Sequence, residues 1–325
     1  MRYYLGVDGG GSKTYAVIAD ERGHVVGIGR GGNGNHQKDR REAELSLKLA
    51  VTEALGAAGL REEQVEFAWF GLAGADREGD FRILRPIVSR LGLPRTEISC
   101  DTWIALRAGT EESHGVVLIC GSGVNCSGKN RAGGTFQCGG FGYRFGDFGG
   151  GYDLSVEVFR TVIRSYEGRE KPTVLSEKLM DFLGYSSVAE LRDDYLDYSK
   201  QLPIGTAELL FHAAEAGDEV AIRLLEKQGK ELGLAAVATI HQLNMGEDSF
   251  QLVLAGSLLT KGDRLGLIRS AIEQKVKQAA PKGTLTILNR EPVVGAVVLA
   301  MERSGVHMNS ELLRVLSQVK VPSTK

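Results

Sequence analysis

The chain has 325 residues, which is too long for one ordinary hydrophobic core and long enough for two. Its composition, 42% hydrophobic and 25% charged, is that of a globular protein and does not indicate extensive disorder. The formal net charge is only −2 and no Lys/Arg-rich run occurs, so neither nucleic acid nor a membrane is an expected partner.

The N-terminus leads straight into a short apolar strand and lacks the longer apolar stretch of a secretory signal. No apolar run approaches the roughly 20 residues of a spanning helix, so a cytoplasmic location is expected. The cysteines stand singly, with no C-x-x-C pair, and are interpreted as small buried hydrophobes. A zinc or iron–sulfur site is the less favoured alternative for Cys100, Cys120, Cys126 and Cys138.

Short apolar runs alternate with amphipathic stretches through the first third of the chain. The longest stretch with helical spacing is followed by Gly59, which predicts the end of that helix. The expected elements are strands at 3–7, 14–20 and 24–29, a helix at 40–58, a strand at 65–72, a helix at 79–91, a strand at 97–100 and a helix beginning at 102–108.

The pattern then restarts, which suggests an internal duplication. Strands are expected at 115–120, 125–129 and 134–138, helices at about 149–168, 174–183, 205–216 and 218–243, a strand at 250–255, a helix near 263–279, a strand at 285–288 and a helix from about 293. This order predicts an α/β protein of two lobes with mixed central sheets and a ligand crevice between them. The predicted lobes are 1–114 and 115–325, with the packing of the last helix on the N-terminal lobe left open.

A glycine cluster directly follows the first strand. Consecutive glycines let the backbone approach a ligand and turn its N–H groups toward an anion. The adjoining hydroxyls and ammonium add donors, and the carboxylate is suited to hold magnesium through water. A strand follows and the P-loop spacing is absent, so this is not a P-loop. A plain hairpin is the alternative to a phosphate site made of Asp8, Gly9, Gly10, Gly11, Ser12, Lys13 and Thr14.

A second glycine turn, Gly121-Ser122-Gly123, lies between two strands at the start of the second half. One such turn is common. Two of them, each opening a similar half of the chain, indicate that both contact one polyphosphate.

Asp101 stands where a strand gives way to a helix. Asp is a favourable N-cap, which is the structural interpretation. The functional interpretation is a general base that accepts the proton of an attacking hydroxyl and orients it in phosphoryl transfer. The two roles are compatible.

Three further segments carry candidate contacts. Residues 139–151 hold seven glycines interleaved with aromatic and charged residues, which favours a tight loop over a polar ligand, with Asp147 contacting hydroxyls. Asn35 lies in a glycine-rich turn and offers an amide to a sugar. Gly256 and Ser257 follow the last long strand, where small residues let a nucleobase or ribose lie against the backbone. A purely structural turn is the alternative for each.

Together these motifs resemble the BadF/BadG/BcrA/BcrD-type ATPase family, in the fold group of actin, the heat-shock chaperone ATPases and sugar kinases. They are most similar to its N-acetylglucosamine kinase branch over residues 5 to about 257. The resemblance implies actin-like (ribonuclease H-like) lobes with an ATP cleft, a catalytic Asp101, and adenosine bordered by Gly256 and Ser257. It also implies sugar contacts by Asn35, His36, Asp101, Val124, Asn125, Gly140, Phe141, Gly142, Tyr143, Arg144 and Asp147.

The implied activity is transfer of the γ-phosphate of MgATP to the 6-hydroxyl of N-acetylglucosamine or a close relative, with homodimerisation left open. Vertebrate members of the branch carry Trp after the Asn-His pair, where this chain has Gln37. Glucosamine and N-acetylmuramic acid therefore stay as alternative substrates. The alternatives of another class are an ATPase that activates a 2-hydroxyacyl-CoA dehydratase and a non-catalytic sugar sensor.

Overall fold

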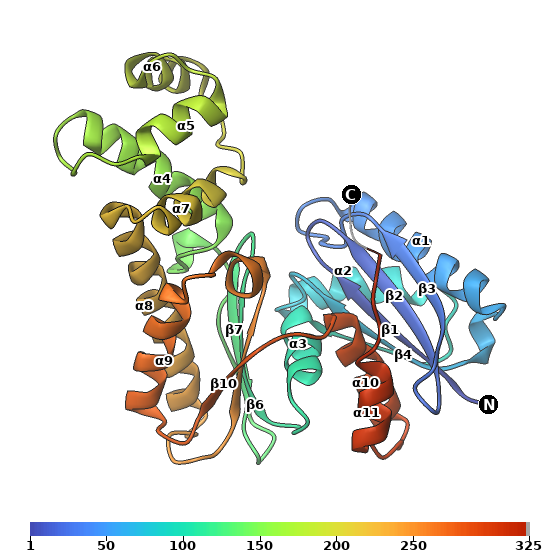
Figure 1. The fold of residues 1–325 in the computed structure, drawn as a ribbon. Coiled ribbons are helices and arrows are strands. Elements are labelled where there is room, and N and C mark those ends of the chain that lie inside the picture. The colour runs from blue at the N-terminus through green and yellow to red at the C-terminus, as the bar shows by residue number, and fades with distance from the viewer. Residues whose placement is uncertain (323–325) are drawn as a thin grey trace. The chain divides into compact units, whose positions relative to one another are not determined.

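The computed structural model describes residues 1–322, which form two compact units (Figure 1). The first unit comprises Met1–Val117 and the C-terminal segment from Leu288, and the second comprises Leu118–Ile287. The sequence placed the change of lobe at residue 114 and left only the last helix open. In the structure the whole segment from Leu288 joins the first unit.

The sheet of the first unit has the strand order β3-β2-β1-β4-β5. Strand β2 is antiparallel to β1 and β3, whereas β4 is parallel to β1 and β5 is parallel to β4. Four of the five strands therefore run the same way and end at one edge. The bounds are β1 Tyr3–Gly9, β2 Thr14–Asp20, β3 Val25–Gly31, β4 Val65–Leu72 and β5 Thr96–Cys100.

Both faces of this sheet are covered. Leu5 and Val7 point into a core shared with α1, whereas Tyr4, the residue before Leu5, packs with the C-terminal helices α10 and α11, and Gly6 lies against Val297 of α10. This period of two is the strand pattern read from the sequence. The helices of the unit are α1 Arg40–Ala58, α2 Glu78–Ser89, α3 Asp101–Gly109, α10 Pro292–Arg303 and α11 Ser310–Leu316, with a 3₁₀ turn, η1, at Glu62–Gln64.

Glycines on β3 let α1 lie directly on the sheet. A Cβ atom at Gly29 would stand 1.9 Å from the carbonyl oxygen of Ala50, and one at Gly27 would stand 2.1 Å from that of Ala54. These glycines, which leave β3 without side chains on this face, fix the position of α1 on the sheet. They thereby also fix the end of the loop that precedes α1.

The sheet of the second unit has the order β10-β9-β6-β7-β8, the order of the first sheet with β6 in the place of β1. This agreement confirms the predicted duplication. The strands are β6 Gly115–Cys120, β7 Val124–Lys129, β8 Thr135–Gly139, β9 Gln251–Ala255 and β10 Thr284–Ile287. The helices are α4 Gly151–Tyr166, α5 Leu175–Leu183, α6 Val188–Tyr198, α7 Thr206–Glu215, α8 Glu219–Gln242 and α9 Leu267–Ala279, with short turns η2 at Tyr143–Phe145 and η3 at Leu258–Gly262.

All the expected strands and helices are present, with ends within a few residues of the predicted ones. Two helices, α6 and α11, were not predicted. Among residues 1–322, no helix combines the length and apolarity needed to cross a bilayer.

The Gly29 contact gives a stability prediction. Gly29→Ala would force β3 and α1 apart and should destabilise the protein by about 2 kcal/mol or more, the usual cost of overpacking a core. Gly56→Ala, in α1 with no atom within 4 Å of the added Cβ, should instead stabilise it slightly through helix propensity. Thermal unfolding of both variants measures the difference, and equal midpoints would contradict this account of the glycines on β3.

Candidate functional site

The hairpin between β1 and β2 is tied to the loop that follows β3. The N–H of Gly10 donates to the carbonyl of Lys13 at 2.9 Å, and the N–H of Gly34 donates to the carbonyl of Gly10 at 2.8 Å. The hydroxyl of Thr14 is fully buried and donates to the carbonyl of Gly32 at 3.0 Å. Thr14 therefore holds the hairpin in place, and its hydroxyl is not presented to a ligand as the sequence suggested.

The tip of this hairpin is exposed and flanked by positive charge. Ser12 and Lys13 are exposed, and Lys13 lies 5.1 Å from the ring centroid of Tyr15. The ammonium group of Lys38 donates to the carbonyl of Gly11 at 3.0 Å. Two ammonium groups beside exposed backbone suit an anion.

Asp8 near the end of β1 and Asp101 directly after β5 lie at the same edge of the first sheet, with β4 between the two strands. Burial raises the pKa of Asp8 to about 7, with the charge of Asp101 adding to the rise and Lys13 opposing it. Burial also raises the pKa of Asp101 to about 6, although the thiol of Cys100 donates to its Oδ1 at 3.2 Å and opposes the shift. Asp101 is therefore suited to exchange a proton near neutral pH.

The structure corrects the capping interpretation. Cys100 occupies the N-cap position of α3, and Asp101 is the first helical residue. The carboxylate of Asp101 is thus not required to begin the helix in the way an N-cap residue is.

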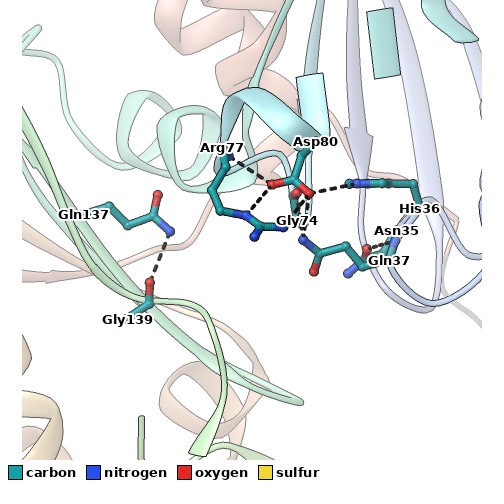
Figure 2. Close-up of polar contacts among 8 residues, drawn as sticks. All are labelled: Asn35, His36, Gln37, Gly74, Arg77, Asp80, Gln137 and Gly139. Carbon is teal, nitrogen blue, oxygen red and sulfur yellow. Dashed lines mark hydrogen bonds and ion pairs between the residues drawn. The ribbon is translucent and has the colours of Figure 1, made fainter. Parts of the chain in front are cut away.

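The loop after β3 is ordered by its own side chains and by one buried carboxylate (Figure 2). Asn33 Oδ1 accepts from the N–H of Asn35 at 3.0 Å, and Asn35 Oδ1 accepts from the N–H of Gln37 at 2.8 Å. The ring of His36 is buried, with Nε2 at 3.2 Å from Oδ1 of Asp80. His36 therefore supports the loop from behind, where the resemblance implied a sugar contact.

Asp80 gathers donors from three residues. It accepts from the N–H and Nε of Arg77, from Nε2 of Gln37 at 3.2 Å and from Nε2 of His36. Burial alone would raise the pKa of Asp80, but these hydrogen bonds outweigh it and lower the pKa to about 2. The carboxylate of Asp80, on α2, is thus ionised at neutral pH and accepts hydrogen bonds from the loop after β3. Sequence reasoning missed it, and the available signal was an Asp three residues after the N-cap of a helix.

In the second unit, the Gly121–Gly123 hairpin rests on the start of α4. The carbonyl of Gly121 accepts from the N–H of Gly151 at 2.8 Å, and that of Ser122 accepts from the N–H of Tyr152 at 3.2 Å. Neither Gly121 nor Gly123 has a positive φ, and a Cβ at either would meet no atom within 4 Å. The fold does not demand glycine at these positions, so the open space is available to a ligand.

Asp147 organises the glycine-rich loop of the second unit. Its Oδ2 accepts from the N–H groups of Gly140 at 3.1 Å, Phe141 at 2.8 Å and Gly142 at 2.5 Å. Nearby, Nε2 of Gln137 donates to the carbonyl of Gly139 at 3.1 Å (Figure 2). This oxygen of Asp147 is committed to the loop, where the sequence had assigned the residue to hydroxyl contacts.

The expected sugar residues of the second unit fall into two groups. Val124, Asn125 and Asp147 line one cavity of about 270 Å³. Phe141, Tyr143 and Arg144 lie on the exposed side of the loop.

The expected adenosine residues have different roles. Gly256 has φ of +88°, and a Cβ there would stand 2.2 Å from the carbonyl oxygen of Cys120, so its turn requires glycine for the fold alone. Ser257 lines a cavity of about 280 Å³ together with Phe211, Lys261 and Arg264. The aromatic ring and the hydroxyl suit a nucleoside, while Glu208 and Glu215 in the same lining balance the two cations, and Glu215 lies 3.6 Å from Arg264.

The structure thus gathers Asp8–Lys13, Asn35 and Asp101 at one edge of the first sheet, Asp8 near the end of β1 and Asp101 at the start of α3. Within residues 1–322, no three His, Cys, Asp or Glu side chains are arranged to hold a metal on their own.

Known proteins resemble the chain over most of its length. The model of the BadF/BadG/BcrA/BcrD ATPase family matches residues 5–300. An N-acetylmuramic acid/N-acetylglucosamine kinase of Clostridium acetobutylicum is 27% identical, over 92% of this chain and 98% of its own. An N-acetyl-D-glucosamine kinase of Dictyostelium discoideum is also 27% identical, over 92% of this chain and 97% of its own.

The crystal structure of a candidate N-acetylglucosamine kinase from Chromobacterium violaceum superposes with a TM-score of 0.74 at 21% identity, covering 92% of this chain and 99% of that one. The predicted α/β fold of two actin-like lobes is thereby confirmed.

The raised pKa of Asp101 makes stability depend on pH. Below its ordinary value of 3.8 the carboxyl is protonated whether the chain is folded or not. As the pH rises through about 6 the folded protein must bury a charge, so stability is lost. Asp101→Asn should therefore match the native protein at pH 4 and exceed it by about 1–2 kcal/mol at pH 8. Thermal unfolding at both pH values tests this, with the exposed Glu273→Gln as control. A stability advantage of Asp101→Asn that does not grow with pH would contradict it.

Proposed function

The chain belongs to the BadF/BadG/BcrA/BcrD ATPase family, and from this premise we propose that it is an ATP-dependent amino-sugar kinase. The reaction is transfer of the γ-phosphate to the 6-hydroxyl of N-acetylglucosamine or a close relative, in keeping with the names of its relatives. The observation that carries the proposal is Asp101, a carboxylate with a pKa near 6 on the same sheet edge as an exposed glycine hairpin.

Asp101 is the proposed base. The sugar O6 attacks the γ-phosphorus, the bond from that phosphorus to the bridging oxygen breaks, ADP leaves, and the hydroxyl proton passes to Asp101. In phosphoryl transfer the base mainly orients the nucleophile, while donors and cations offset the charge of the transferred group.

The glycine hairpins are the proposed phosphate sites. Gly10–Ser12 and Gly121–Gly123 each follow the first strand of their sheet and are the segments proposed to offer backbone N–H groups to phosphate, whereas Gly9 ends β1 and is buried against Leu72. Lys13 and Lys38 offset phosphate charge. Asp8 fits a magnesium ion, because a cation relieves its repulsion with Asp101, and magnesium when bound supplies further charge compensation.

The remaining assignments complete the proposal. The cavity beside Ser257 takes the adenosine, and Asn35, Asn125 and the loop of Gly140–Arg144 contact the sugar. Glucosamine and N-acetylmuramic acid are the alternative acceptors, the latter being named for the Clostridium relative.

ADP release measured with each sugar in turn tests the function. We expect turnover with N-acetylglucosamine, glucosamine or N-acetylmuramic acid to exceed that without sugar by orders of magnitude. Sugar-independent ATP hydrolysis, or none with any amino sugar, would contradict the kinase assignment.

Asp101→Asn tests the base. The variant should lower kcat by roughly 100-fold or more while leaving both KM values near those of the native enzyme. In the native enzyme kcat/KM for the sugar should fall as the pH drops below about 6, because the base becomes protonated. Near-normal kcat in the variant would remove Asp101 from the mechanism.

Gly123→Ala tests the second phosphate hairpin. The added methyl group meets no protein atom, so the unfolding midpoint should not change, whereas KM for ATP should rise roughly 10-fold through lost backbone–phosphate bonds. Gly79→Ala in α2, which is equally unhindered, is the matched control. An unchanged KM for ATP would place the phosphates elsewhere.

A further inference from the structure

Gln228 is a fully buried polar residue in an apolar part of α8, between Leu224 and Leu232 on the buried face of that helix. Its Nε2 donates to the carbonyl of Gly149 at 2.5 Å. Its Oε1 is buried and finds no hydrogen-bond partner in the described part of the chain, residues 1–322. Because an unpaired buried acceptor costs stability, an apolar side chain would serve a purely structural role better. The contact with Gly149 is therefore what the amide contributes.

The carbonyl of Gly149 belongs to a tight turn that leads into α4. Gly149 has φ of +105°, and a Cβ there would stand 2.7 Å from Cγ of Gln228, so the turn lies directly on that side chain. The N–H groups of Gly149 and Gly150 donate to Oδ2 of Asp153 at 3.1 and 3.2 Å. The thiol of Cys120 donates to the carbonyl of Gly149 at 3.2 Å. Asp153 thus holds the donors of the turn, and Gln228 with Cys120 holds its acceptor.

The same turn supports the second glycine hairpin. A Cβ at Gly150 would stand 2.6 Å from the Cα of Gly123, so the two backbones are in direct contact. The N–H of Gly151 donates to the carbonyl of Gly121 at 2.8 Å. Gly121 and Gly123 have no side chains to pack, so these backbone contacts decide where the hairpin lies. A shift of the turn would therefore shift the hairpin.

Resting on the proposed function, we infer that Gln228 is a positioning residue for the nucleotide. Its amide fixes the carbonyl of Gly149, and the turn passes that position on to the backbone N–H groups of Gly121–Gly123, which contact the phosphates of ATP. Gln228 is fully buried and acts through the turn. Donors that are aligned before the nucleotide arrives bind it at a smaller entropic cost. Loss of the amide should weaken binding of ATP more than binding of the sugar.

Gln228→Met tests the inference. Methionine is similar in length and volume but has no donor, and Gly149 keeps the thiol of Cys120 as a partner, so the unfolding midpoint should change little. KM for ATP should rise about 3- to 10-fold, the range of one hydrogen bond, while KM for the sugar stays near its native value. Thr239→Val, which removes a buried hydroxyl from the same helix where it contacts Cys126 of β7, is the matched control and should leave KM for ATP unchanged.

Combination with Gly123→Ala supplies the second arm. Both changes act on one hairpin, so the double variant should raise KM for ATP by less than the product of the two single effects. The dissociation constant of MgADP, measured by calorimetry, gives the same comparison without a sugar acceptor. It therefore tests Gln228 even if the native protein phosphorylates no amino sugar, a result that would overturn the proposed function alone.

A purely structural role for Gln228 would lower the unfolding midpoint and leave both nucleotide constants at their native values. If Gly123→Ala weakens nucleotide binding and Gln228→Met does not, the inference is wrong and the proposed function stands. If Gly123→Ala has no effect on nucleotide binding, the phosphates bind elsewhere, and the hairpin assignment and this inference are both wrong.

Discussion

The parallel alignment of β1, β4 and β5 is the constraint on which the site depends. Gly9 pairs in register with Leu72, and Leu72 pairs with Cys100, so the residues that follow these strands emerge in one row. This row brings Asp8 and Asp101 close enough that the charge of Asp101 raises the pKa of Asp8, although the two are far apart in sequence. Because β3 runs in the same direction, its loop reaches the same edge.

The sequence predicted the sheets well because their strands are buried apolar runs bounded by glycines, and α1 because its helical spacing ends at Gly59. It did not reveal α6, since Val188 and Leu191 are the buried residues of that helix and acidic side chains interrupt its apolar pattern. The local sequence pattern also could not predict that the C-terminal segment packs in the first unit. This arrangement depends on α10 packing against β1, where Gly6 leaves room for Val297.

Within the site, the sequence could predict those residues whose role depends only on their neighbours along the chain. A glycine hairpin or a carboxylate at a strand end is visible from a few neighbours. Asp80 was missed because its importance lies in His36 and Gln37, which are 44 and 43 residues away. The same limit explains the roles of Thr14 and Asp147. A polar side chain beside a glycine loop can bind a ligand or hold the loop, and only its three-dimensional partners decide between the two.

The two sheets share a backbone plan but differ in chemistry. Leu72-Ala73-Gly74 and Leu254-Ala255-Gly256 occupy equivalent strand ends, and φ is +79° at Gly74 and +88° at Gly256. Where β1 carries Asp8 before its glycines, β6 carries Cys120, whose pKa burial raises to about 12 and whose thiol donates to the carbonyl of Gly149. The second copy thus keeps the turn and replaces the acid with a neutral group. The end of β1 can therefore exchange protons near neutral pH through Asp8. The end of β6, with Cys120 in the equivalent position, offers a ligand only its backbone.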